Sequence, residues 1–200
     1  MNRIKIICLC FLVLSFFFLV SLNKKEEVSE LSEAYQEAVL QIDSLSIYRY
    51  NFEFNMQLMG TRLDDLSGQT EDLQKTKLSD MINDGPILVY RYADINCHVC
   101  IESEIETIQK NFIGKEDHIL LLCSYRTERD FSIFKKLNKL KFPAFRIPYD
   151  ALKWSIEKQS NPYCFVLHPD LKVSDVFIPD KSFPVLNDLY LQGIKRLIEK

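Results

Sequence analysis

The stretch ILVYRYADINCHVCIESEIETIQKNF, residues 87–112, combines an apolar run, two closely spaced cysteines and a helical pattern. The β-branched and aromatic residues from Ile87 to Tyr92 predict a buried strand. From Cys100 to Phe112 apolar residues recur three and four positions apart, which predicts a helix with one buried face. Cys97 and Cys100 fall at the junction between these two elements. Both the fold and the function of the chain therefore depend on this junction.

The rest of the chain after this junction alternates predicted strands and helices. The expected elements are a strand at 118–125, a helix at 127–140, an extended segment at 144–147 and a short helix at 151–158. Two strands joined by a turn follow at 163–178, and a final helix at 185–199. A parallel strand–helix–strand unit followed by an antiparallel hairpin gives a mixed sheet with helices on both faces. We therefore predict an α/β fold with a mixed central sheet for residues 78–200.

The two cysteines have the spacing of a dithiol that can form and break a disulfide. A cysteine at the first turn of a helix lies beside free backbone N–H groups and the positive end of the helix dipole, and both favour the thiolate. We therefore expect Cys97 to be the attacking thiol and Cys100, one turn further on, the resolving thiol. His98 and Val99 lie between them, where contact with substrate is expected, and a protonated His98 would stabilise the thiolate further. An exposed loop residue is an equally good interpretation of His98.

Three parts of the sequence resemble the thioredoxin-like superfamily, and most closely its membrane-anchored bacterial thiol–disulfide oxidoreductases of the TlpA/ResA type. They are the strand–CxxC–helix junction at residues 87–112, SNP at 160–162 and FVLHPDLKV at 165–173. The resemblance as a whole covers residues 78–200. The resemblance implies a thioredoxin-like fold that exchanges with protein thiols or disulfides. It implies no metal or organic cofactor, since the redox-active group is the Cys97–Cys100 disulfide. Pro162 matches the family's cis-proline, so Asn161 and Pro162 would form a substrate-binding groove beside the cysteines.

The chain departs from the family around the cysteines. The family commonly carries a glutamate three residues after the second cysteine, where this chain has Ser103 between Glu102 and Glu104. Thioredoxin's buried acid in the preceding strand is replaced by Arg91, and Asn96 stands where an aromatic residue commonly precedes the first cysteine. These departures affect the proton relay and the redox potential more than the dithiol itself.

Other interpretations of the cysteines are open to different degrees. A zinc site needs two further ligands at metal spacing, and the remaining candidates form no second CxxC or HxxxH: Cys123, Cys164, His118 and His168. Peroxide reduction would favour a threonine where Asp94 stands. The main alternative is a redox-inert binding or scaffold module with a static Cys97–Cys100 disulfide. Cys123 is expected in the core, and Cys164 is either a core residue or a third thiol near the pair. The net charge of −3 gives no reason to expect nucleic acid as a partner.

Residues 1–25 predict a signal anchor. Arg3 and Lys5 precede an uncharged run of 17 residues, Ile6 to Leu22, which is near the lower limit for a membrane-spanning helix. No small-residue cleavage site follows, so a cleaved signal peptide is the second choice. A short N-terminal tail before a long domain predicts a single pass through a bacterial inner membrane, with the C-terminal domain on the periplasmic or extracytoplasmic side.

Residues 26–77 predict a helical stalk between membrane and domain. A heptad seam runs through large apolar residues with few exceptions: Val28, Leu31, Tyr35, Ala38, Ile42, Leu45, Arg49, Phe52, Met56, Met59, Leu63 and Leu66. A spacing of 3.5 residues sustained over several heptads is typical of a coiled coil, and such a stalk would make the chain a homodimer. A single long helix lying on its own domain is the alternative.

Overall fold

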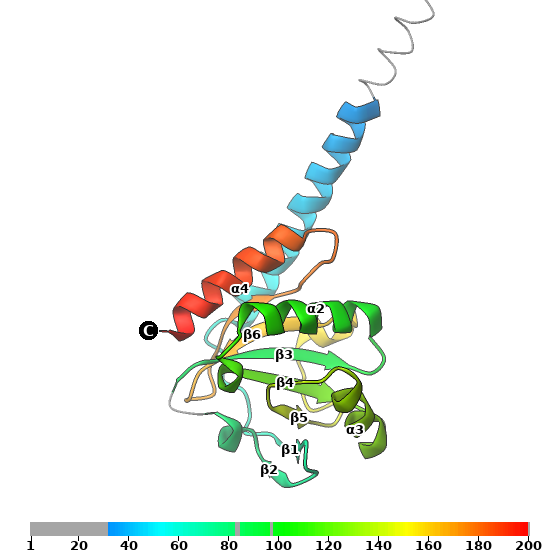
Figure 1. Cartoon of the computed structure of the whole chain (residues 1–200). Helices are drawn as coiled ribbons and strands as arrows, with labels where there is room; N and C mark the ends of the chain where they lie inside the picture. Colours follow the sequence, from blue (N-terminus) through cyan, green and yellow to red (C-terminus); the bar gives the residue numbers. More distant parts are fainter. Residues whose placement is uncertain (1–31, 83–84, 97, 200) are drawn as a thin grey trace, which may run out of the picture. The chain divides into compact units, whose positions relative to one another are not determined.

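The computed structural model describes residues 32–82, 85–96 and 98–199 (Figure 1). The chain divides into two units between Tyr48 and Arg49. The described part of the first unit, residues 32–48, is helical, and residues 49–58 of the second unit are helical as well. The apolar run 6–22 lies outside the described residues, and within them no helix has the length and apolar character needed to cross a membrane.

The second unit is built on a seven-stranded mixed sheet in the order β2-β1-β5-β4-β3-β6-β7. The strand bounds are, from β1 to β7: Ser67–Thr70, Lys75–Lys77, Ile87–Ala93, Ile119–Ser124, Ala144–Arg146, Tyr163–Leu167 and Val173–Phe177. Strands β3, β4 and β5 are parallel, whereas β6 is antiparallel to β3 and β7 to β6. This confirms the predicted mixed sheet. The carboxyl ends of β3, β4 and β5 and the start of β6 consequently meet at one edge.

Helices cover both faces of this sheet, as predicted. The α-helices are α2 (His98–Asn111), α3 (Glu128–Leu137) and α4 (Pro184–Ile198). The 3-10 helices are η1 (Leu78–Met81), η2 (Glu116–His118) and η3 (Ser155–Gln159). One core lies between the sheet and α2, α3 and α4, and includes Ile105, Phe131 and Leu191. The core on the other face includes Phe54 and Ile156. Helices α2 and α4 run side by side over the sheet (Figure 1).

The structure differs from the predicted stalk after residue 58. There the helix ends, and β1 and β2 form a hairpin whose first strand pairs with β5. Leu63, assigned to the heptad seam, is instead buried in the core of the second unit. A heptad pattern does not distinguish an apolar side chain that faces a second copy from one that packs on its own domain. Gly68 suits the hairpin because a Cβ there would lie 2.5 Å from the Arg146 carbonyl oxygen.

Candidate functional site

Cys100 lies in the first turn of α2, at the edge where the parallel strands end. Cys97 lies outside the described residues. Cys100 is partly exposed and lines a cavity of about 340 Å³ together with Asn161 and Pro162, which precede β6. The structure thus brings together Cys100, Asn161 and Pro162, three of the predicted site residues.

His98 and Val99 lie outside this cavity, on the exposed side of the first turn of α2. The Val99 side chain is 69% exposed. The His98 Nδ1 atom is 3.5 Å from a Glu102 carboxylate oxygen, and the His98 ring meets the Phe134 ring edge-on. Both residues are accessible to a large partner approaching the site, whereas a ligand inside the cavity would not meet them.

Glu104 is the buried acid of the cavity. It lies one turn after Cys100 on the same face of α2 and is only 7% exposed, whereas Glu102 and Ser103 are exposed. Burial raises the pKa of the Glu104 carboxyl from 4.5 to about 7, and the nearby charge of Asp188 adds to the rise. The Asn187 amide is 3.4 Å from a Glu104 carboxylate oxygen. Helical periodicity from Cys100 could have singled out Glu104.

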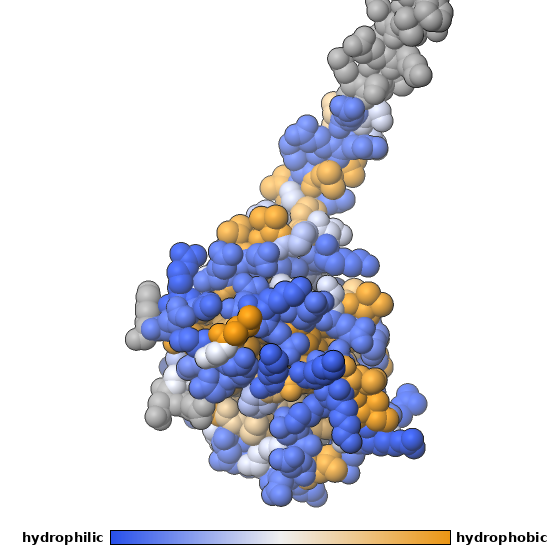
Figure 2. Space-filling view, viewed as in Figure 1, coloured by the Kyte–Doolittle hydropathy of each residue, from blue (hydrophilic) through white to orange (hydrophobic). Residues whose placement is uncertain are grey.

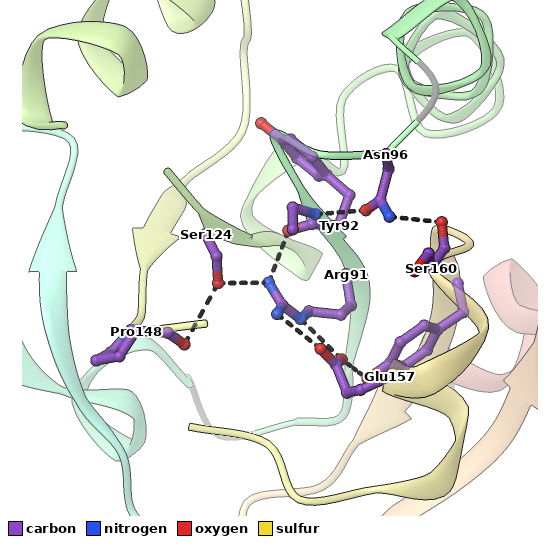
Figure 3. A network of polar contacts seen from close by, with 9 residues as sticks. Arg91, Tyr92, Asn96, Ser124, Pro148, Glu157 and Ser160 are labelled. Carbon is purple, nitrogen blue, oxygen red and sulfur yellow. Dashed lines mark hydrogen bonds and ion pairs between the residues drawn. The ribbon is translucent and has the colours of Figure 1, made fainter. Parts of the chain in front are cut away.

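Asn96, the residue before Cys97, connects two segments of the site (Figure 3). Its Oδ1 accepts from the Ala93 N–H at 2.6 Å, and its Nδ2 donates to the Ser160 carbonyl at 2.6 Å. An amide can bridge two backbone groups in this way, because its oxygen accepts and its NH₂ group donates. Asn96 therefore connects the end of β3 to the loop that carries Asn161 and Pro162.

Arg91 carries a buried positive charge beneath this bridge and is 1% exposed. Its Nε and Nη2 donate to the two Glu157 carboxylate oxygens at 3.0 and 2.9 Å, and Nη1 donates to the Tyr92 carbonyl and the Ser124 hydroxyl. The Tyr163 hydroxyl donates to Glu157 as well. Figure 3 shows how this network joins β3, β4 and η3. A lone arginine in an apolar strand indicates a buried acidic partner, yet its position in the sequence gave no means of choosing Glu157.

The other two described cysteines are core residues. Cys123 and Cys164 carry free, fully buried thiols. Burial raises the pKa of the Cys123 thiol to about 12, and burial followed by the charge of Glu104 raises the pKa of Cys164 well above its usual range. Both thiols are protonated at neutral pH and are poor nucleophiles. Within the described segments no group of three or more His, Cys, Asp or Glu side chains is arranged to hold a metal ion.

No family model matches the chain, and no curated protein matches its sequence. Solved structures do match. A candidate protein disulfide isomerase from Bacteroides thetaiotaomicron gives a TM-score of 0.54 at 15% identity, covering 71% of this chain and 91% of the other. A thiol:disulfide interchange protein from Bacteroides sp. gives a TM-score of 0.53 at 17% identity, covering 71% of this chain and 91% of the other. The thioredoxin domain of a thiol-disulfide oxidoreductase from Bacteroides vulgatus gives a TM-score of 0.51 at 17% identity, covering 70% of this chain and 97% of the other.

The chain has a thioredoxin-like fold. One feature implied by the sequence resemblance is absent from this thioredoxin-like chain, because the described residues contain no cis peptide bond and the bond before Pro162 is trans. The chain turns at Ser160 instead, which has a left-handed φ of 54° and closes η3. Pro162 nevertheless lies against the cavity beside Cys100.

Proposed function

We propose that the chain is a thiol–disulfide oxidoreductase that acts on protein partners through Cys97 and Cys100. The observation that carries the proposal is the position of Cys100, in the first turn of α2 and beside Asn161 and Pro162 at an open cavity. Two solved structures with the same fold are a thiol:disulfide interchange protein and a thiol-disulfide oxidoreductase. No metal or organic cofactor enters the proposed reaction.

In the proposed reaction, the Cys97 thiolate attacks one sulfur of a partner disulfide. The partner's S–S bond breaks, its other sulfur leaves as a thiolate, and a mixed disulfide joins Cys97 to the partner. The Cys100 thiolate then attacks the Cys97 sulfur and releases the partner's second thiolate. The partner gains two electrons and two protons, and Cys97–Cys100 becomes a disulfide. The reverse sequence would oxidise a partner dithiol.

Glu104 is proposed as the group that takes the proton from Cys100 before the second step. It lines the same cavity one turn away, and its raised pKa of about 7 allows both protonation states near neutrality. Buried carboxyls with such a pKa are common at functional sites.

The raised pKa of Glu104 predicts a specific dependence of stability on pH. In the unfolded chain this carboxyl has a pKa near 4.5, so between pH 4.5 and about 7 the folded chain holds a proton that the unfolded chain has lost. The free energy of unfolding should fall across this window, by up to about 3 kcal/mol, and the contribution is constant above it. Glu104→Gln should remove this fall and be more stable than the wild type at pH 8 by about 1–3 kcal/mol.

Urea unfolding at pH 5 and pH 8 measures this effect. The matched control is Glu106→Gln, the same substitution at an exposed position on the same helix, which should retain the wild-type dependence. Equal pH dependence in Glu104→Gln and the wild type would show that Glu104 does not titrate as proposed.

Trapping of the mixed disulfide tests the proposed reaction itself. With Cys100 replaced by alanine, the second step cannot occur, and Cys97 should stay joined to a disulfide-bearing protein substrate. Non-reducing electrophoresis should show an adduct that dithiothreitol separates by reducing the mixed disulfide. The double variant Cys97→Ala/Cys100→Ala should not form this adduct. Failure of Cys100→Ala to form any adduct would favour a binding module with a static disulfide.

We also propose that residues 6–22 anchor the chain in a bacterial inner membrane, with the second unit on the periplasmic side. The support is the uncharged run and its charged flanks. Protease treatment of intact spheroplasts that leaves the second unit undigested would contradict this orientation.

A homodimer through the helix is the accompanying proposal. Large apolar side chains at seam positions are more than half exposed: Tyr35, Ile42, Leu45, Phe52, Met56 and, just after the helix, Met59. Figure 2 shows hydrophobic residues among hydrophilic ones on the surface of the helix. In the second unit, Phe54 and Leu58 pack into the domain core, and at 100° per residue they lie on the side of the helix away from Phe52 and Met56. Packing on the domain therefore leaves Phe52 and Met56 accessible to a second copy, whereas Leu63 of the seam is buried.

The dimer predicts a difference between two positions that are both more than half exposed. Ile42→Glu, on the seam, should give a monomer in sedimentation velocity, whereas Leu40→Glu, off the seam, should leave the dimer intact. A wild-type chain that sediments as a monomer at high micromolar concentration would contradict the proposal.

A further inference from the structure

A second, larger cavity of about 630 Å³ lies beside the ends of β4 and β5 and has no part in the proposed exchange. This basic cavity is lined by residues of the β1–β2 hairpin, the segment after β4, and the end of β5 with the segment that follows it: Ser67, Gly68, Gln69, Lys75, Tyr125, Arg126, Arg146, Ile147, Pro148, Tyr149 and Asp150. Its size is within the range of ligand-binding clefts. Three of its lining side chains are cationic and one is a carboxylate, on a chain whose net charge is −3.

One cationic group of this cavity, the Arg146 guanidinium, is held by the fold. Arg146 is fixed by Gln69, which accepts a hydrogen bond from it, by the Tyr125 carbonyl at 3.4 Å and by Glu128 at 3.7 Å. Gln69 in turn donates to Glu128 at 2.7 Å. Glu128 thus offsets part of the charge of Arg146, while Lys75 and Arg126 are exposed at the wall. A guanidinium fixed in this way loses little further conformational entropy when it binds a carboxylate.

Asp94 connects this basic cavity to the segment between β3 and α2, which leads to the cysteines. The residue directly follows β3, and its N–H donates to the Ser124 carbonyl at 2.9 Å. One Asp94 carboxylate oxygen accepts from the Arg126 backbone N–H at 3.0 Å, and the other accepts from the Tyr149 hydroxyl. The Arg126 backbone and the Tyr149 side chain are therefore held against the segment that leads from β3 toward the cysteines.

The basic cavity and the cavity beside Cys100 are joined through shared walls. Tyr149 lines both the basic cavity and a smaller cavity of about 140 Å³ that includes Asn96 and Asn161. Asn161 also lines the cavity beside Cys100. The three cavities thus follow one another along the edge where β3, β4 and β5 end. An extended polypeptide lying along this edge would reach Cys100 and Arg126 at the same time.

We propose that the basic cavity binds an acidic side chain of the protein substrate whose cysteine reacts at Cys97–Cys100. The substrate class would then be extended, cysteine-containing segments with a carboxylate on the side of the basic cavity. The part of this inference that concerns the reacting cysteine rests on the proposed function. The part that concerns the carboxylate site rests only on the residues that line the basic cavity. Opposite charge would both increase the association rate and set the direction in which the segment lies.

Binding of cysteine-free peptides to the full chain tests the carboxylate site separately from redox chemistry. Fluorescently labelled extended peptides carry serine for cysteine and differ only in several glutamates or the same number of glutamines. At low salt the glutamate peptide should bind about tenfold more tightly in fluorescence anisotropy, and 0.5 M NaCl should remove the difference. Arg126→Gln should also remove it, whereas Lys110→Gln, the same change on an exposed cation of α2, should not.

Three outcomes would overturn the inference. They are equal binding of the two peptides, a preference that Arg126→Gln leaves unchanged, and displacement of the glutamate peptide by free succinate at equimolar carboxylate, which would indicate a small-molecule site. The proposed function is tested by the same peptides with their cysteines restored as a disulfide. If the preference for glutamate persists while the reduced chain reduces neither peptide, the carboxylate site holds and the oxidoreductase proposal fails.

Discussion

Replacing Cys97 by serine is expected to lower the second-order rate constant for reduction of a peptide disulfide by roughly a thousandfold or more. A serine hydroxyl is not ionised near neutral pH and is a much weaker nucleophile than a thiolate. The loss should therefore appear at the first step of exchange. Stopped-flow fluorescence with the reduced chain in excess over a quenched disulfide peptide measures this step directly.

Cys164→Ala is the control for this prediction. Cys164 is buried and its pKa is raised, so the variant should retain the wild-type rate constant within a few-fold once its folding has been verified. If Cys97→Ser kept more than a tenth of the wild-type rate constant, another thiol would be the attacking group. Loss of the rate in Cys164→Ala instead would identify that thiol.

Replacing Glu157 by glutamine is expected to lower the free energy of unfolding by about 3–5 kcal/mol. The substitution keeps the size of the side chain but leaves the Arg91 guanidinium, 1% exposed, without its counter-charge. The loss of one partner from a buried pair costs more than the pair contributes, because the remaining charge stays desolvated. Guanidinium chloride unfolding followed by circular dichroism measures the change.

An exposed ion pair provides the matched control. Glu106→Gln removes the partner of Lys110 at 3.1 Å, where both side chains are about 70% exposed, and should change the free energy of unfolding by less than about 1 kcal/mol. The double variant Arg91→Met/Glu157→Met should be less destabilised than Glu157→Gln, since it leaves no unpaired charge. Similar values for Glu157→Gln and Glu106→Gln would mean that the Arg91 charge is solvated by other means.

Much of the fold could be predicted from the sequence because the apolar patterns after residue 86 are local. The strand before the cysteines was predicted at 87–92 and lies at Ile87–Ala93, and the final helix was predicted at 185–199 and lies at Pro184–Ile198. The end of the stalk could not be predicted. Leu63 fits both a heptad seam and a domain core, and pairing of β1 with β5 joins residues about 75 positions apart.

The candidate site could be predicted only where one segment supplies it. The CxxC and its helix are contiguous, so the place of Cys100 in the first turn of α2 follows from helical periodicity. The Arg91–Glu157 pair and the bridge from Asn96 to Ser160 connect residues more than 60 positions apart, and neither leaves a local pattern.

The reduction potential of the full chain tests the central claim most directly. The chain would be equilibrated in glutathione and dithiothreitol buffers, with mass tagging of thiols and with Cys97→Ser as the reference that identifies the responding pair. A reversible two-electron transition of Cys97 and Cys100 between roughly −120 and −280 mV, the range of known exchange proteins, is predicted. A potential well below about −300 mV, or two thiols that never pair, would contradict the proposed exchange.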